Sequence, residues 1–391
     1  MLRVAVVGGG LGGLAAANAL AARGIEVSVY EQAPALGEVG AGVQLAPNGA
    51  RQLRRWGLWD AVVRAGAHLG AGSRYHRQDG TPVAPVVTAD SSGWGALFGM
   101  HRADLVDILA ANLPDGTVRT GHRCTGIEQD DDGARLTFAG GPTAEADVVV
   151  AADGIHSTLQ HHVVPPSEPV FSGSIAYRGL VPHAQVPDWP TDRFLLWMGE
   201  GKHVLVFPVR GGEMVNYVGF VPTGEQQRES WSAQGDPDAL RAAFAGWDPA
   251  VERLLAQVTS CFWWGLYDRE PLPRWTAGRL TLLGDAAHPM LPHLGQGVNQ
   301  AIEDAATLAV LLDGTDPATA PAALRAYERL RRERTSAVQA GARANGLRYD
   351  SGYDDLAVRD AELAATAELR RWIYDHDALV PAQAAAAELR H

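Results

Sequence analysis

Residues 2–13 of the chain, LRVAVVGGGLGG, join a short apolar run to a glycine-rich loop. Leu2–Val7 has the composition of a strand that is buried on both faces, and the Ala- and Leu-rich segment Leu14–Arg23 is typical of a helix. Glu26–Glu31 predicts the next strand. A strand, a helix and a second strand form a βαβ unit, so the chain is expected to open with an α/β domain.

The glycine loop satisfies the pattern G-x-G-x-x-G at Gly8, Gly10 and Gly13. The first glycine of this pattern permits a tight turn, the second lets the backbone approach a pyrophosphate, and the third lets the helix pack closely on the strand. The N-terminus of that helix offers free N–H groups and a partial positive charge to the phosphates. Glu31, 18 residues beyond Gly13, is placed to accept hydrogen bonds from a ribose 2′-hydroxyl. The segment therefore predicts an adenine dinucleotide site that disfavours NADP, without distinguishing NAD from FAD.

The overall composition limits the class of protein. A formal charge of −12 and a pI near 5.5 leave no basic face to neutralise phosphates, which argues against a nucleic-acid partner. The segment Arg325–Arg334 alternates with Glu328 and Glu333, which predicts a solvated helix face. Two cysteines without a CxxC pair suit a reducing compartment. No run of about 18 residues is apolar enough to span a bilayer, and the chain starts directly in a strand. A cytoplasmic protein without a membrane partner is therefore expected.

The middle of the chain differs in texture from its start. Ser167–Trp275 holds most of the tryptophans and several alternating segments, which predicts a mostly antiparallel sheet. Leu280–Leu283 then returns to the texture of a buried strand, and Gly297–Leu312 is a strongly predicted helix. The expected fold is α/β, with a discontinuous Rossmann-like domain, an inserted lobe built on a mostly antiparallel sheet, and C-terminal helices. The expected division is a cofactor domain of residues 1–70, 99–166 and 276–340, a substrate lobe of residues 71–98 and 167–275, and a C-terminal helical segment of residues 341–391.

Asp147–Ala152 has the texture of a second buried strand, and Leu280–Leu283 that of a third. Three further segments follow the first βαβ unit and these two strands in turn: Glu38–Asn48 (EVGAGVQLAPN), Asp153–Ser157 (DGIHS) and Gly284–Pro289 (GDAAHP). The last of these continues through Pro292, Gly295-Gln296-Gly297, Asn299 and Glu303-Asp304-Ala305. Together with the glycine loop, these segments resemble the single-component (group A) FAD-dependent aromatic hydroxylases. The chain is most similar to the branch that holds salicylate hydroxylase and 6-hydroxynicotinate 3-monooxygenase, over roughly residues 2–335.

The flavin side of the expected site depends on the segment Gly284–Asn299. Asp285, at the end of a strand, can accept hydrogen bonds from flavin ribityl or ribose hydroxyls, although the same residue could simply cap a helix. The loop Gly295–Asn299 lets the backbone approach a planar ring, and the following helix would stabilise negative charge on a reduced flavin. The resemblance implies that Asp153 contacts FAD and NAD(P)H and that Arg102 reaches FAD. The residues expected at the cofactor are Gly8, Gly10, Leu11, Gly13, Glu31, Gln32, Gly42, Val43, Arg102, Asp153, Asp285, Gly295, Gly297, Val298 and Asn299.

The chain departs from the family at one position, and at others the resemblance assigns no catalytic role. The family usually has an arginine three residues after the serine of the DG segment, where this chain has Gln160, so the choice between NADH and NADPH is left open. Tyr177-Arg178-Gly179 matches a family segment without an assigned role. From the residues alone, a core tyrosine beside a salt-bridged arginine is expected there. His288 is expected to be a structural hydrogen-bonding residue.

The resemblance implies a reaction in two halves. NAD(P)H reduces a tightly but non-covalently bound FAD, and O2 then forms a C4a-hydroperoxide that hydroxylates an electron-rich aromatic ring. No metal is needed, and the sequence offers no metal-ligand cluster. The protein must exclude water, orient the ring and remove a proton from a phenol-like group.

The candidate bases are two histidines. His203 begins an H-x-x-x-aromatic stretch that related hydroxylases use for substrate contact, and it ends here at Phe207, where a tyrosine is common. His293 follows Pro292 on the flavin-side loop. Either histidine could instead be a satisfied structural residue.

Other classes of function stay open at this point. The same scaffold could carry out epoxidation, oxidative decarboxylation or dehydrogenation of a non-benzenoid substrate, or it could bind flavin without catalysis. The expected partners are an aromatic small molecule, NAD(P)H and O2, in a monomer or homodimer. The identity of the substrate is not predicted.

Overall fold

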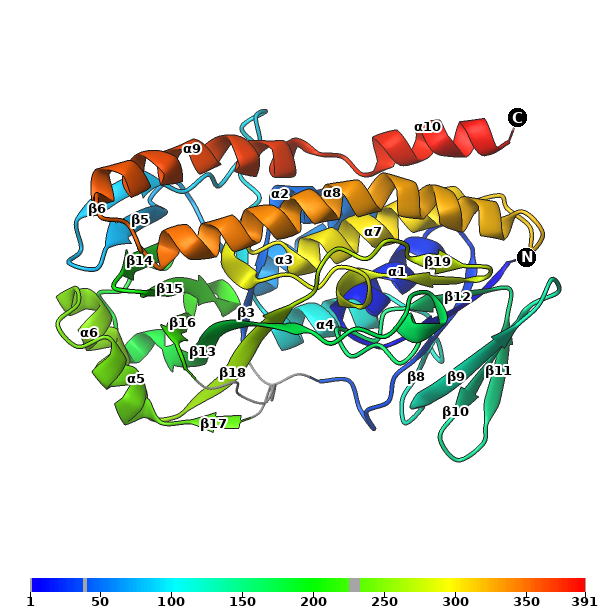
Figure 1. Ribbon diagram of the computed structural model, residues 1–391, viewed down its shortest axis with the longest axis horizontal. Coiled ribbons are helices and arrows are strands. Elements are labelled where there is room, and N and C mark those ends of the chain that lie inside the picture. The colour runs from blue at the N-terminus through cyan, green and yellow to red at the C-terminus, as the bar shows by residue number, and fades with distance from the viewer. Residues whose placement is uncertain (1, 38–40, 225–232, 391) are drawn as a thin grey trace.

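The computed structural model describes residues 2–37, 41–224 and 233–390, and it is an α/β structure with two main sheets (Figure 1). Helices cover the first sheet, and the C-terminal helices lie across the top of the view. The expected segment Glu38–Asn48 is described from residue 41 onward, so its part at 38–40 lies outside the described residues.

The first main sheet has six strands. Its order is β19-β20-β12-β1-β2-β8, and all neighbouring strands are parallel except β19 and β20. Since the central strands run the same way, the loops that follow β1, β12 and β20 leave from one edge of the sheet. The strands are β1 (Arg3–Val7), β2 (Glu26–Tyr30), β8 (Val118–Arg119), β12 (Val148–Ala151), β19 (Thr276–Ala277) and β20 (Leu280–Leu282).

Helices enclose this sheet and give the first hydrophobic core. Helix α1 (Leu11–Ala21) begins immediately after the glycine loop and packs against α7 (Gly297–Leu312) and α4 (Arg102–Ala111). Helix α7 is buried along almost its whole length because α1, α2 (Pro47–Arg55) and α8 (Ala320–Tyr349) surround it. Further helices are α3 (Trp59–Ala65), α9 (Leu356–Asp375) and α10 (Leu379–Leu389).

The second main sheet has eight strands in the order β17-β18-β13-β16-β15-β14-β5-β6. Every neighbouring pair is antiparallel except β14 and β5. Its strands are β5 (Arg74–Arg77), β6 (Pro82–Pro85), β13 (Val170–Pro182), β14 (Leu195–Gly199), β15 (Lys202–Val209), β16 (Met214–Pro222), β17 (Ala233–Gly235) and β18 (Cys261–Asp268).

Side chains alternate across the eight-stranded sheet, as strand geometry requires. Val204 and Val206 on β15 pack into a core with α5 (Pro237–Ala243) and α6 (Pro249–Ala256), whose N-termini are capped by aspartates followed by proline. Leu205 and Phe207 belong to a different core that includes residues of α8 and α9. The face that carries these odd-numbered residues of β15 is the one that matters for the site.

Two small sheets complete the fold. One is β3 (Gly42–Leu45), β7 (Phe98–His101) and β4 (Ala67–His68), and the other is β9 (Cys124–Gln129), β10 (Ala134–Phe138) and β11 (Thr143–Ala146). Short 3-10 turns include η1 (Gln160–His162), η2 (His183–Gln185), η3 (Arg210–Gly212), η4 (Gly284–Ala286) and η5 (Pro292–Leu294). Within the described ranges, no helix is both long and apolar enough to cross a membrane.

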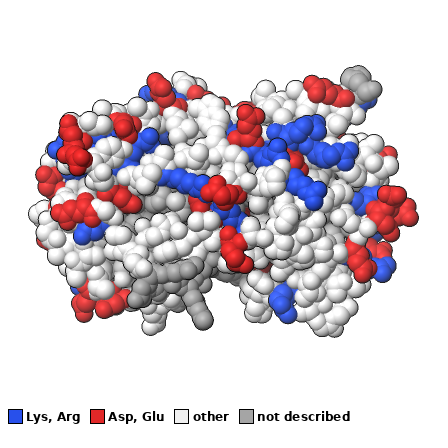
Figure 2. Space-filling model, in the orientation of Figure 1, with Lys and Arg blue, Asp and Glu red and all other residues white. Residues whose placement is uncertain are grey.

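The charged surface and one charged helix face can be compared with the sequence. On the face shown in Figure 2, Lys and Arg side chains are interspersed with Asp and Glu side chains. The predicted solvated face of α8 is only partly correct. Arg325 and Arg329 are exposed, but Arg331 and Arg334 are buried. The prediction was wrong for these two arginines because their acidic partners lie on α7, out of reach of a local charge pattern.

Candidate active site

A cavity of about 310 Å³ lies between the loop edge of the six-stranded sheet and one face of the eight-stranded sheet. This volume is within the range of small-molecule sites. The glycine loop, the segment 41–44, the loops after β12 and β20, the start of α7 and strands of the eight-stranded sheet all reach it. Its lining includes Gly10, Leu11, Gly12, Gly42, Val43, Gln44, Arg102, Gly154, Arg178, Leu205, Phe207, Val218, Phe220, Trp264, Asp285, Met290, Pro292, Gly295, Gly297 and Val298.

The glycine loop has the geometry expected of a pyrophosphate cradle. Gly8 adopts a φ of 108°, and a Cβ on Gly13 would lie 1.9 Å from the Gly8 carbonyl oxygen, so helix and strand can meet only if position 13 is glycine. A Cβ on Gly10 would meet no atom within 4 Å, so its backbone faces open space at the cavity. The residues present therefore fit a dinucleotide phosphate here.

Glu31 lies next to this loop, and its carboxylate is already in use. It accepts the backbone N–H of Gly9 at 2.6 Å and of Ala33 at 2.7 Å. These bonds hold the loop in shape, and a carboxylate has further lone pairs for a ribose hydroxyl. Gln32 is exposed. Neither Glu31 nor Gln32 lines the cavity, and their contact with a cofactor stays a prediction.

Asp285, in the turn after β20, and Arg102, at the start of α4, both line the cavity. Solvent in the cavity reaches the Asp285 side chain, but the protein around it is dense, and this burial raises the pKa of its carboxyl group while His288 and Arg102 lower it in part. Burial likewise lowers the pKa of the Arg102 guanidinium, and Asp285 opposes that effect. The pair offers a hydrogen-bond acceptor and a donor to a hydroxylated or phosphorylated chain between them.

The loop before α7 brings backbone to the cavity. Gly295, with a φ of 64°, Gly297 and Val298 line it, and α7 begins at Gly297 with its N-terminus toward the same space. Asn299 does not line the cavity. Its side-chain oxygen accepts the Ala46 N–H at 2.8 Å, and its amide donates to the carbonyls of Gln44 and Gly295 at 2.9 Å each. Asn299 therefore ties the loop to the segment that includes β3.

The loops after β12 and β20 are also tied together. The Asp153 side chain accepts the Thr158 N–H at 2.8 Å and so shapes its own turn. Its neighbours Ala152 and Gly154 line the cavity. Gln160, which stands where the family has an arginine, donates its amide to the Ala286 carbonyl at 2.8 Å. The bond fixes the two loops relative to each other.

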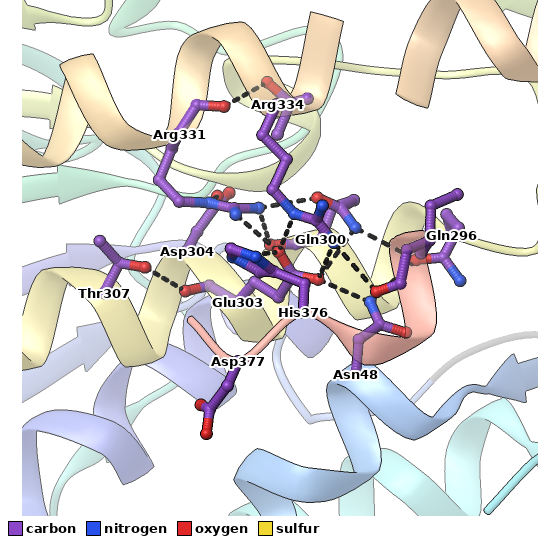
Figure 3. A network of polar contacts seen from close by, with 12 residues as sticks. Asn48, Gln296, Gln300, Glu303, Asp304, Thr307, Arg331, Arg334, His376 and Asp377 are labelled. Atoms are coloured by element: carbon purple, nitrogen blue, oxygen red, sulfur yellow. Dashed lines mark hydrogen bonds and ion pairs between the residues drawn. The ribbon is translucent and has the colours of Figure 1, made fainter. Parts of the chain in front are cut away.

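A buried network of polar contacts joins Glu303 and Asp304 of α7 to Arg331 and Arg334 of α8 (Figure 3). Its contacts through Asp304 also reach the loop of Asp285. Asp304 accepts hydrogen bonds from the Gly284 N–H at 3.1 Å and the Arg331 Nε at 2.7 Å, and it pairs with His288 at 2.5 Å. The bond to Asp304 gives His288 the structural role that was expected of it. Since Asp304 is on α7, the network fixes the Asp285 loop to the helix whose N-terminus faces the cavity.

Glu303 is the second acidic residue of this network. It pairs with Arg331 at 2.6 Å and Arg334 at 2.7 Å, and accepts the Asn48 amide at 2.7 Å (Figure 3). Burial alone would raise the pKa of Glu303, but the two guanidinium groups lower it to about 2. With Asp304, the cluster has two carboxylates and two guanidinium groups, so its charges balance.

Among the described residues, the sheet side of the cavity is apolar except for one arginine. Strand pairing places Arg178 of β13 beside Val218 of β16, with Leu205 next along the row on β15, and Trp264 lies over the Arg178 guanidinium at 4.2 Å. Burial, and then the like charge of Arg102, lower the pKa of Arg178 to about 10. From the sequence, a core tyrosine beside a salt-bridged arginine was expected at Tyr177-Arg178, with no role at the site. Strand alternation alone does not say which face of the sheet meets the cavity.

His203 and His293 come together although 90 positions separate them in the sequence. Their rings are 5.1 Å apart, and the His203 ring stacks on Phe220, which lines the cavity, at 4.2 Å. Burial lowers the pKa of both histidines, with Asp350 opposing this at His203. His203 lies within β15 on the face of Leu205 and Phe207. Both histidines are thus behind the first layer of the cavity wall, where Pro292 is in direct contact with the space.

Comparisons with known proteins agree over nearly the whole chain. The FAD binding domain family matches residues 1–342. A 3-amino-4-hydroxybenzoate 2-monooxygenase from Streptomyces platensis is 41% identical over 383 residues, covering 96% of each chain. A 6-hydroxynicotinate 3-monooxygenase from Bordetella bronchiseptica is 39% identical, covering 86% of this chain and 89% of the relative. The structure of a salicylate hydroxylase substrate complex has a TM-score of 0.84 at 31% identity, covering 98% of this chain and 97% of that one.

Proposed function

This chain belongs to the FAD-dependent aromatic monooxygenases, and we propose that its own substrate is an aromatic ring bearing a hydroxyl and a carboxylate. One observation supports the proposal above others. In the part of the chain that the structure describes, the cavity wall opposite the flavin-side loops is apolar apart from one buried guanidinium, Arg178. The three relatives named above act on hydroxybenzoate, hydroxynicotinate and salicylate, which share this pair of substituents.

The cofactor would be held by the elements that line one side of the cavity. The glycine loop would bind the pyrophosphate, Asp285 and Arg102 the chain between phosphate and ring, and the Gly295–Val298 backbone the ring itself. Bound FAD supplies the transfer of electrons from a reduced nicotinamide to O2, so that one oxygen atom enters the substrate. The N-terminus of α7 would stabilise negative charge on the reduced ring.

Arg178 would bind the substrate carboxylate. A guanidinium matches a carboxylate with two parallel N–H donors, and the bond is strong where water is excluded. Trp264 restricts the guanidinium to one orientation by lying over it at 4.2 Å. A bound anion would also offset the burial of this cation, which lowers the pKa of Arg178 to about 10.

His203 would remove the proton of the ring hydroxyl, with His293 as its neighbour. Burial keeps both imidazoles neutral by lowering the pKa of each, and a neutral imidazole is the form that accepts a proton. Phe207, Val218 and Phe220 give the dry wall that a deprotonated, electron-rich ring requires. Removal of the proton makes the ring carbon next to the hydroxyl a better nucleophile.

The first experiment tests the substrate class through Arg178. NADH and NADPH consumption and product mass are measured on paired substrates, each hydroxybenzoate beside the phenol that lacks the carboxylate. Arg178→Gln should raise KM for the carboxylates about 10- to 100-fold, as expected when a charge-assisted pair is lost, and leave KM for the simple phenols nearly unchanged. Arg74→Gln, an exposed arginine on the same sheet, is the matched control. An equal change in KM for both members of each pair would contradict the proposal.

The second experiment tests the bases. His203→Gln and His293→Gln should keep FAD, and at least one of them should uncouple NAD(P)H oxidation from hydroxylation. The loss in the rate of hydroxylation should be about 100-fold or more, the usual contribution of general base catalysis. His161→Gln at an exposed position serves as the control. If both variants stay fully coupled, neither histidine is the base.

We propose in addition a cytoplasmic protein that is monomeric or homodimeric. Both cysteines, Cys124 and Cys261, are buried and unpaired, which suits a reducing compartment. The division into a cofactor domain, a substrate lobe and a C-terminal segment at the boundaries given above is likewise a proposal. Size-exclusion chromatography with light scattering checks the oligomeric state, and limited proteolysis checks the division into domains.

A further inference from the structure

The end of helix α8 lies against the strand that carries His203. Asp350 follows the last residue of α8, and its backbone carbonyl accepts the Gly201 N–H at 2.8 Å, which fixes the helix end to the turn between β14 and β15. Its side-chain Oδ1 is 2.9 Å from the His203 Nδ1. The contact joins residues that are 147 positions apart, and no motif in the sequence predicts it.

The two nitrogens of the His203 ring have different surroundings. The imidazole is 1% exposed, and its Nε2 has no hydrogen-bond partner among the residues that the structure describes. An imidazole whose Nδ1 lies at a carboxylate carries its proton on Nδ1, so its Nε2 lone pair is free to accept. Phe220, which the ring covers at 4.2 Å, forms the cavity wall beside it.

The charges near His203 come from three elements. Asp350, at the end of α8, is the acidic group in contact with the ring, and its side chain is 34% exposed. His293, from η5, contributes an imidazole at 5.1 Å. Tyr349 packs on the ring at 5.2 Å, and its hydroxyl accepts from the buried Arg370 of α9 at 3.3 Å. The hydroxyls of Tyr75 and Tyr374 also contact that guanidinium, from β5 and α9. Asp350 is therefore the one group of this set that favours a proton on His203.

We propose that Asp350 is a positioning residue for His203, which fixes the acceptor tautomer of the ring and gives its proton an outlet to water. The inference rests on the proposed role of His203 as the base. The step requires the substrate hydroxyl to reach Nε2 past Phe220, which lies between the His203 ring and the cavity. There the O–H bond of the substrate phenol breaks and an N–H bond forms at Nε2, leaving a phenolate and an imidazolium. The Nδ1 proton then passes to the Asp350 carboxylate, whose exposed edge releases it to solvent.

The experiment reads the protonation of the bound substrate without turnover. A hydroxybenzoate is bound to the oxidised holoenzyme, and phenolate formation is followed by ultraviolet difference spectra as a function of pH. Asp350→Asn removes the charge that favours the imidazolium, so phenolate should form at a pH about one to two units higher, in line with the usual effect of an adjacent opposite charge. Coupled hydroxylation at pH 7 should fall about tenfold. Asp350→Glu should restore much of both, whereas Asp354→Asn, at an exposed neighbouring position, should change neither.

The possible results distinguish a failure of the proposed role of Asp350 from a failure of His203 as the base. If His203→Gln shifts the phenolate titration and Asp350→Asn does not, the role of Asp350 is refuted while the base stands. If His203→Gln leaves the titration unchanged, the base assignment fails and the role of Asp350 fails with it. Should Asp350→Asn fold poorly, Asp350→Ser is measured with added formate, which can reach this partly exposed position. Recovery of the titration with formate supports the proposal, and no recovery overturns it.

Discussion

Replacing Glu303 by glutamine should weaken the fold by several kcal/mol although the new side chain has nearly the same shape. Glu303 is completely buried and pairs with both Arg331 and Arg334. With glutamine in its place, Arg331 keeps its pair with Asp304, but Arg334 loses the carboxylate that it pairs with in this network, so the cluster carries an excess positive charge. Removing one partner of a buried ion pair typically costs about 3–5 kcal/mol.

The size of the expected shift in Tm follows from the length of the chain. At about 2.1 cal/mol/K per residue, 391 residues give an unfolding entropy of roughly 0.8 kcal/mol/K. A loss of 3–5 kcal/mol then lowers Tm by about 4–6 °C if the chain unfolds as one unit. Glu145→Gln is the matched control, because its partner Arg135 and its own side chain are 57% and 62% exposed. That pair should change Tm by about 1 °C or less.

The stability of the folded protein should also depend on pH through Glu303. Burial by itself raises the pKa of Glu303, but Arg331 and Arg334 lower it by a larger amount. The net result is a fall from 4.5 to about 2 in the folded protein. A depressed pKa contributes stability above the unfolded value, and this contribution is lost as pH falls from about 4.5 toward 2, a change of about 3 kcal/mol. The difference in Tm between Glu303→Gln and the parent, measured by calorimetry, should therefore shrink on acidification. A difference that equals that of the control, or one that is constant from pH 7 to pH 3, would refute this account of the network.

Three further changes test how the cofactor side is built. Gly13→Ala should abolish FAD retention, because the new Cβ would lie 1.9 Å from the Gly8 carbonyl oxygen. Retention is measured by the flavin absorbance of the purified protein. Gly126→Ala, where a Cβ meets no atom within 4 Å, is the control and should retain FAD. Asn299→Ala removes three hydrogen bonds behind the flavin-side loop and should weaken FAD binding about 10- to 100-fold in a fluorescence titration; an unchanged Kd would show that the loop holds its shape without them. Gln160→Ala leaves a buried carbonyl without its donor and should lower the free energy of unfolding by about 1–3 kcal/mol in a denaturant titration, and a loss below about 0.5 kcal/mol would contradict the importance of this tie.

The parts of the molecule that could be predicted from sequence are those whose signal is local. Helix α7 was expected at Gly297–Leu312 and has these bounds in the structure. The expected α/β fold and the family are confirmed by the comparisons. The glycine loop could be predicted because strand, turn and helix are consecutive, and the need for glycine at position 13 comes from Gly8, five residues earlier. The roles of the individual site residues stay predictions.

The substrate side could not be predicted because its residues are assembled by strand pairing over long separations. Arg178 faces the cavity only because β13 pairs with β16 and β18 in one register, and a shift of one residue would turn it to the other face. Asp350 meets His203 across 147 positions. The burial of Arg331 has the same origin, since its carboxylates are on a different helix. In each case the sequence holds both partners but not the pairing between them.

Helix α9 and the residues after it form a mechanical brace across the molecule. At one end Asp360 pairs with Arg77 of the eight-stranded sheet at 2.7 Å, and at the other Asp377 pairs with Arg55 at the end of α2 at 2.6 Å. Swinging the two halves apart on this side would break both ion pairs and expose the apolar core beneath α9. A hinge motion that separates the two sheets on the side of α9 is therefore opposed both by these ion pairs and by the apolar surface that it would expose to water.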